Sequence, residues 1–134
     1  MRWGFIVDIT NSKEPNAVIR EVRTQASQAA SALPSGPEHL YRVGITFYQS
    51  KDRYLIDDPE KPREDRGDID NLVKQVFDGL GPIIGFRRKW KEINGIWKDF
   101  ESNNPADSKI IELIAKKVNS GSKREFVSVE IETI

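Results

Sequence analysis

Hydrophobic and polar positions alternate with a period of two in several segments of the chain, a pattern that predicts β-strands. Arg2–Thr10 alternates loosely and is rich in β-forming residues, and Tyr41–Gln49 alternates more regularly. Lys109–Lys117 and Phe126–Ile134 are predicted as a closing pair of strands around the turn Asn119–Ser122, although the first of them also has the composition of a short helix.

Two other segments have apolar residues at helical spacing. The first, Pro15–Leu33, is rich in alanine, so we expect it to pack closely against a sheet. Pro15 in its first turn and Pro34 beyond its end are consistent with those limits. The second extends from Asp68 to about Leu80, where Gly81-Pro82 is expected to end it.

The remaining segments predict no regular element. Ser50–Gly67 is polar, contains two prolines and is expected to be an exposed loop, whereas Ile83–Pro105 mixes aromatic and charged residues without a clear period. Three aromatic residues are expected in the core: Trp3, Trp97 and Phe126. The chain is therefore predicted to be a single domain, residues 1–134, of the α/β (α+β) class, with a small mixed β-sheet of about four strands and two main helices.

Composition restricts the chemistry available to this domain. The 134 residues include no cysteine and one histidine, His39, so a bound metal would depend on carboxylates, which suit Mg²⁺. Acidic and basic residues number 21 each, which argues mildly against a nucleic-acid partner unless basic residues cluster locally. No apolar run approaches the ~18 residues that span a bilayer, and no signal peptide is evident, so a cytoplasmic protein without membrane contact is expected.

The polar side of the second predicted helix carries the most informative residues. Lys74 follows Asp70 by four residues and lies beside it one turn further on. Asp68 joins them if it precedes the helix in extended backbone or at the N-cap. Two carboxylates and a lysine can bind a divalent cation and stabilise charge during phosphodiester hydrolysis. On spacing alone, a capping aspartate and an ordinary surface ion pair remain the alternative.

The string Asp-x-Asp-Asn-x-x-Lys-x-x-x-Asp-x-Leu, at 68–80, resembles the signature of the RusA family of Holliday-junction resolvases. A second segment, 106–113, resembles the family's later strand, which a further acid begins; Asp107 matches that acid. The resemblance implies four catalytic residues, of which the three acids bind metal: Asp68, Asp70, Lys74 and Asp107. It also implies supporting roles for Asn71 and Asp78.

This resemblance implies a magnesium-dependent endodeoxyribonuclease, with Mn²⁺ as a substitute, that resolves four-way DNA junctions by paired nicks in recombination and repair. It further implies a homodimer, since a two-fold enzyme matches a two-fold junction. The chain departs from the family pattern at Ala106 and Lys109, lacks its proline-rich segment after the first strand, and has a longer segment at 83–105. The alternatives are a catalytically inactive or diverged branched-DNA-binding protein of the same fold, and a nuclease for flaps, forks or single strands.

Two groups of basic residues are candidates for contacting DNA phosphates. One precedes the paired acids: Lys61, Arg63 and Arg66. The other surrounds Trp90, which could stack on an unpaired base: Arg87, Arg88, Lys89 and Lys91. For both groups, a solvated charged surface is the alternative interpretation.

Overall fold

The computed structural model describes residues 2–10, 16–30, 38–50 and 69–134. The elements follow one another along the chain as β1 (Arg2–Asp8), α1 (Ala17–Ala30), β2 (Tyr41–Gln49), α3 (Ile69–Gly79), α4 (Gly81–Ile84), β3 (Phe86–Ile93), β4 (Ile96–Pro105), a 3-10 turn η1 (Asp107–Lys109), β5 (Ile110–Asn119) and β6 (Phe126–Thr133). The predicted loop at 50–67 lies almost wholly outside the described residues.

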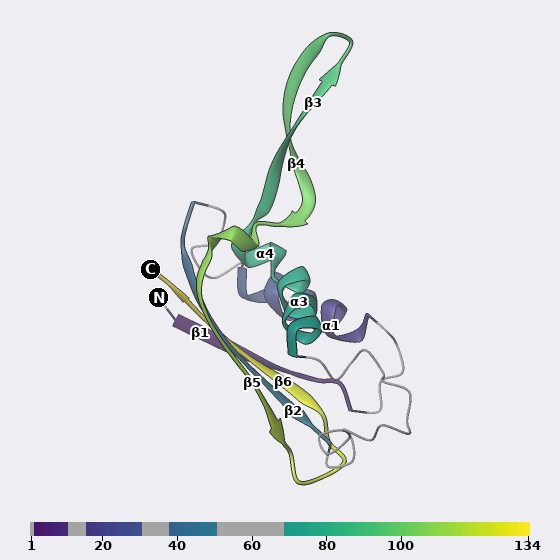
Figure 1. The fold of residues 1–134 in the computed structure, drawn as a ribbon, viewed down its shortest axis with the longest axis vertical. Coiled ribbons are helices and arrows are strands. Elements are labelled where there is room, and N and C mark those ends of the chain that lie inside the picture. Colours follow the sequence, from purple (N-terminus) through teal and green to yellow (C-terminus); the bar gives the residue numbers. More distant parts are fainter. Residues whose placement is uncertain (1, 11–15, 31–37, 51–68) are drawn as a thin grey trace.

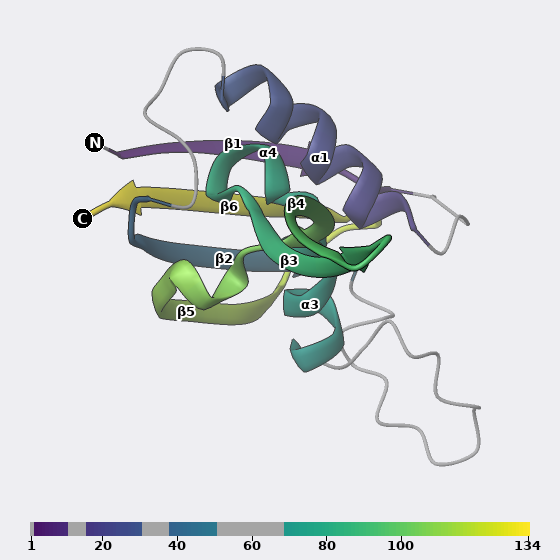
Figure 2. The ribbon, with the colours of Figure 1, turned by 90° about the horizontal axis from the view of Figure 1, so that it is seen from above.

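Within the described residues the main sheet has four strands in the order β1-β6-β2-β5. Strand β6 is antiparallel to both of its neighbours, whereas β2 and β5 are parallel. All three α-helices of the described part lie on one face of this sheet (Figure 1), with α1 beside β1 and α3 beside β5 (Figure 2). The predicted α+β class with a small mixed sheet and two main helices is confirmed.

The core forms where the helices cover the sheet. Alternate residues of β2 and β6 face the helices and are buried, as the period of two in the sequence requires. The buried core residues are Val7, Val18, Val22, Ala26, Tyr41, Val43, Ile45, Phe47, Leu72, Val76, Leu80, Ile83, Ile84, Val127, Val129 and Ile131. The Tyr41 hydroxyl donates a hydrogen bond of 3.1 Å to the Ile83 carbonyl, so the largest of these side chains is buried without losing its polar partner.

The predicted pairing of the last two strands is wrong. Strands β5 and β6 both exist, but β2 lies between them in the sheet. The chain crosses the end of β2 on its way, where the Ser120 N–H donates to the Gln49 carbonyl at 2.9 Å. Parallel pairing with β5 on one side and antiparallel pairing with β6 on the other make β2 an interior strand, so both of its backbone edges are hydrogen-bonded.

The two predicted helices are confirmed, with two corrections of detail. Helix α1 contacts α3 and α4 as well as β1, so its small residues serve helix–helix packing as much as contact with the sheet. Gly81 and Pro82 do not simply end the second helix; they begin the short helix α4, with the proline in the first turn, where its missing N–H has no cost. Gly81 also lies against the Phe86 ring.

Residues 83–105, for which the sequence predicted no regular element, contain a second, two-stranded sheet. Strands β3 and β4 form an antiparallel hairpin that extends away from the main sheet and the helices (Figure 1). Asn94 and Gly95 connect them with φ angles of 52° and 77°, as a two-residue hairpin loop of type I′ requires. Trp97, predicted in the core, is 63 % exposed because it lies on this hairpin.

Candidate active site

Helix α3 separates its apolar side from the residues with candidate chemistry. Leu72 and Val76 are buried against the core, whereas Asp70 and Lys74 are exposed on the other side. Asp70 and Lys74 are one helical turn apart, yet neither forms an ion pair within the described part of the chain. Both side chains are therefore accessible to a ligand. Asp68, the acid expected beside them, lies outside the described residues.

The direction of α3 follows from the strands that it connects. Strands β2 and β5 are parallel, so the chain leaving the carboxyl end of β2 must return through α3 to the amino end of β5. The first turn of α3, which contains Asp70, thus lies toward the carboxyl ends of these strands, the end at which open α/β sheets bind ligands. Asp107 is in the turn η1, which immediately precedes β5 and therefore lies at the amino end of these strands.

This arrangement does not bring Asp107 to Asp70, although the resemblance implied that they share a metal. Asp107 instead forms an ion pair with Arg87, at the start of β3. The neighbouring Ala106 is buried and its N–H donates to the Gly85 carbonyl at 2.9 Å. Together these contacts join the base of the hairpin to α4 and η1, so Asp107 and Arg87 act as partners at the hairpin base.

The predicted basic cluster on β3 also divides into two kinds of residue. Arg88 binds both carboxylate oxygens of Asp99, its Nη2 at 3.0 Å from Oδ2, and this hydrogen bonding raises the pKa of Arg88. Lys89 and Lys91 are exposed and form no ion pair among the described residues. The other predicted group, Lys61, Arg63 and Arg66, lies outside the described residues.

The two predicted supporting residues, Asn71 and Asp78, are both on α3 and partly buried. The Asp78 backbone carbonyl accepts a hydrogen bond of 3.3 Å from Arg23 Nη2 on α1. Asp78 therefore lies where α3 meets α1, two turns from Asp70, and helps to hold the two helices together.

A metal site on α3 would need Asp68 in addition to Asp70. The described ranges 2–10, 16–30, 38–50 and 69–134 contain no group of three His, Cys, Asp or Glu side chains that could hold a metal ion. Asp70 supplies one carboxylate of the type that binds Mg²⁺. Asp68 precedes it by two residues, and the pair fits a divalent cation if both carboxylates turn to the same side.

Gln49 is a polar residue at this end of the sheet that sequence reasoning missed. It is the last residue of β2 and is 4 % exposed, and its side-chain Oε1 has no hydrogen-bond partner. A buried amide oxygen without a partner is costly, and such groups are often explained by function. The sequence does contain a clue, since Gln49 continues the alternate positions that are otherwise apolar in β2.

Comparison with known proteins leaves the family open. No protein-family model matches this sequence, and no curated protein matches it. Of the helices that the structure describes, none has the length and apolar character needed to cross a membrane. The likeness to the RusA family thus depends on the residues at 68–80 and 106–113 alone.

Proposed function

We propose that this protein is a metal-dependent DNA endonuclease that acts on branched DNA, as the RusA-like resolvases do. The observation that carries the proposal is that Asp70 and Lys74 lie next to each other on the exposed side of α3. They are adjacent and exposed on α3 without ion-pair partners in the described chain, at the carboxyl end of two parallel strands. An acid and a lysine that are adjacent but unpaired are available to a cation and to a phosphate, respectively.

In this proposal Asp68 and Asp70 hold a divalent cation, Mg²⁺ or Mn²⁺, which supplies Lewis-acid chemistry for phosphodiester hydrolysis when bound. Lys74 lies one turn from Asp70 and donates to a non-bridging phosphate oxygen, where negative charge develops. The proposal leaves Asp107 out of this site, because Asp107 forms an ion pair with Arg87 beside the amino end of β5. A two-fold dimer of such chains would make the paired nicks that resolve a four-way junction.

The test is cleavage of a synthetic four-way DNA junction with Mg²⁺, compared with linear duplex and with EDTA. Asp70→Asn should lower the cleavage rate at least about 100-fold, because it weakens binding of the cation, and a bound cation contributes several kcal/mol of transition-state charge stabilisation. Asp78→Asn is the matched control, since it removes the same charge from the same helix two turns away. Equal rates for wild type and Asp70→Asn would overturn the site.

The second candidate is a branched-DNA-binding protein of this fold without catalysis. The finding that favours it is the ion pair between Asp107 and Arg87, which gives the acid matched to the family's later strand a partner at the base of the hairpin. The same assay separates the candidates: junction binding without cleavage in Mg²⁺ or Mn²⁺ indicates the binder. Adding flap, fork and single-stranded substrates shows whether a cleaving enzyme prefers another DNA structure.

A further inference from the structure

The two faces of the β3–β4 hairpin differ in charge. Side chains of directly opposed residues lie on the same face, and successive residues alternate between faces. The register pairs Lys91 with Lys98 and Lys89 with Phe100. One face, here called the lysine face, therefore consists of Lys89, Lys91, Ile93, Ile96, Lys98 and Phe100.

No acidic residue occurs on the lysine face, and its three lysines form no ion pair in the described part of the molecule. Lys91 directly faces Lys98, and like charges in this position destabilise a hairpin. The other face shows the opposite pattern. On that face Asp99 binds Arg88. The same face also has two further acids, Glu92 and Glu101, and the exposed side chains of Trp90 and Trp97. Within the hairpin, unneutralised positive charge is thus concentrated on one side.

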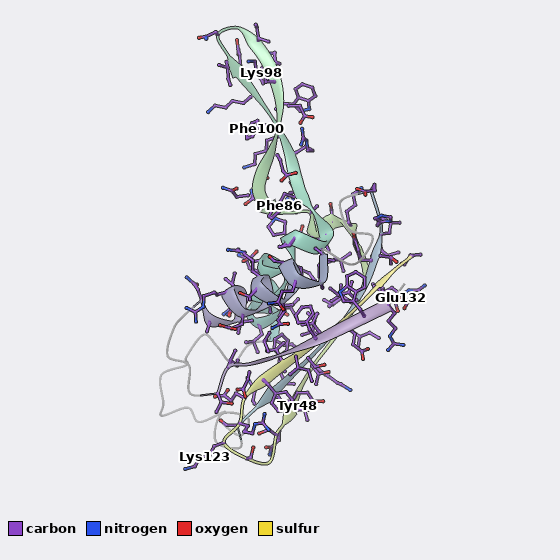
Figure 3. The ribbon with its side chains drawn as sticks, turned by 180° about the vertical axis from the view of Figure 1, so that it is seen from behind. Tyr48, Phe86, Lys98, Phe100, Lys123 and Glu132 are labelled. Atoms are coloured by element: carbon purple, nitrogen blue, oxygen red, sulfur yellow. The ribbon has the colours of Figure 1, made fainter. Side chains whose placement is uncertain are left out.

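The hairpin extends from the domain and is held at its base, which makes it accessible to a large partner (Figure 1). All of its residues from Arg87 to Glu101 are exposed, and Lys98 and Phe100 lie away from the main sheet and the helices (Figure 3). A two-stranded ribbon of this kind fits the major groove of duplex DNA. The Arg87–Asp107 ion pair and the Ala106–Gly85 hydrogen bond fix its base to the domain.

We propose that the lysine face of the hairpin binds the phosphate backbone of a duplex DNA arm. The choice of DNA as the polyanion rests on the proposed function, whereas the location of the contact rests on the hairpin itself. Repulsion between Lys91 and Lys98 is relieved when phosphates lie opposite them, and each neutralised phosphate releases counterions. The proposed contact does not include Arg87 and Arg88, because neighbouring carboxylates already offset their charge.

The experiment measures binding of a fluorescently labelled four-way junction and of a linear duplex by anisotropy, in EDTA, so that cleavage does not intervene. Lys91→Gln/Lys98→Gln should weaken binding of both DNAs about tenfold or more and lower the salt dependence, log K against log[salt], by about 1.8. Arg2→Gln/Lys116→Gln is the matched control, because it removes the same charge from the sheet face opposite to the helices. Affinity within twofold of wild type is expected for it.

Lys91→Arg/Lys98→Arg should restore both affinity and salt dependence, which separates charge from packing. Equal binding by wild type and the Gln variant would overturn the proposal, as would equal loss in the Gln variant and the control. Loss of binding only in Trp90→Ser/Trp97→Ser would place the contact on the other face and overturn it too. If the lysine variant changes self-association measured by sedimentation but not DNA binding, the face is an interface between copies instead.

These outcomes are distinguishable from failure of the proposed function. If wild type binds DNA through these lysines but never cleaves it, the proposed DNA contact is supported and the proposed nuclease activity is rejected. If wild type cleaves DNA and the lysine variant binds DNA with unchanged affinity, the nuclease activity is supported and the proposed DNA contact is rejected. Wild type that binds no DNA in low salt overturns the hairpin proposal outright.

Discussion

Basic residues that are neighbours on strand β3 have different partners. Arg87 and Arg88 each bind a carboxylate, whereas Lys89 and Lys91 form no ion pair within the described residues, although all four were predicted to contact phosphates. A linear sequence cannot separate them, because the acids that bind the arginines come from later segments. Helices α1 and α3 approach each other closely at Gly79, where an added Cβ would lie 2.7 Å from the Val22 side chain.

We predict that Gly79→Ala lowers the free energy of unfolding by about 1–3 kcal/mol through overpacking, although alanine favours a helix by ~1 kcal/mol. Urea denaturation followed by circular dichroism measures this. Gly44→Ala is the control, because the nearest atom to its added Cβ, on Glu130, is 3.9 Å away; its stability should stay level or rise by about 0.5–1 kcal/mol. A Gly79→Ala protein as stable as wild type would mean that the helices are further apart than described.

The β3–β4 hairpin is the element that the hydrophobic pattern of the sequence did not predict. Its strands are exposed on both faces, so apolar and polar residues need not alternate, and the period of two is weak. The Asn94-Gly95 dipeptide was the available sign of a two-residue turn. A hairpin that contacts the domain only at its base should contribute little to the stability of the core.

We predict that replacing Trp90–Asp99 with Asn-Gly shortens the hairpin without unfolding the domain. The Asn94-Gly95 turn joins the directly opposed pair Ile93 and Ile96. Lys89 and Phe100 are also directly opposed, and they lie an even number of residues away from that pair. The two pairs therefore have the same hydrogen-bonding geometry, and the same two-residue turn can join either of them. The midpoint of thermal unfolding should stay within a few degrees of wild type, since a shift of 4–8 °C corresponds to roughly 1 kcal/mol in small domains. A large loss of stability would show that the hairpin packs on the core.

For the whole molecule, the crossover from β2 through α3 to β5 decides which candidate residues can act together. It places Asp70 at the carboxyl end of the parallel strands and Asp107 at their amino end. Metal binding, if Asp68 and Asp70 provide it, stabilises the folded chain over the unfolded one.

We predict that Mg²⁺ at ten times its dissociation constant stabilises wild type by about 1.4 kcal/mol. Asp70→Asn should lose this effect and Asp107→Asn should keep it. The measurement is the unfolding midpoint against Mg²⁺ concentration, with Na⁺ matching the ionic strength. If Asp107→Asn also abolished the effect, the three acids would have to meet in solution, contrary to the arrangement described here.

The sequence by itself determined the elements of the main sheet and both main helices, because burial on one face imposes the periods of 2 and 3.6 on the chain. It also indicated that Asp70 and Lys74 are neighbours, since four residues make about one helical turn. Only the tertiary structure decided that β2 separates β5 from β6, that Arg87 binds Asp107, and that the hairpin has a lysine face. These features join residues distant in sequence or unburied strands, for which local patterning carries no information.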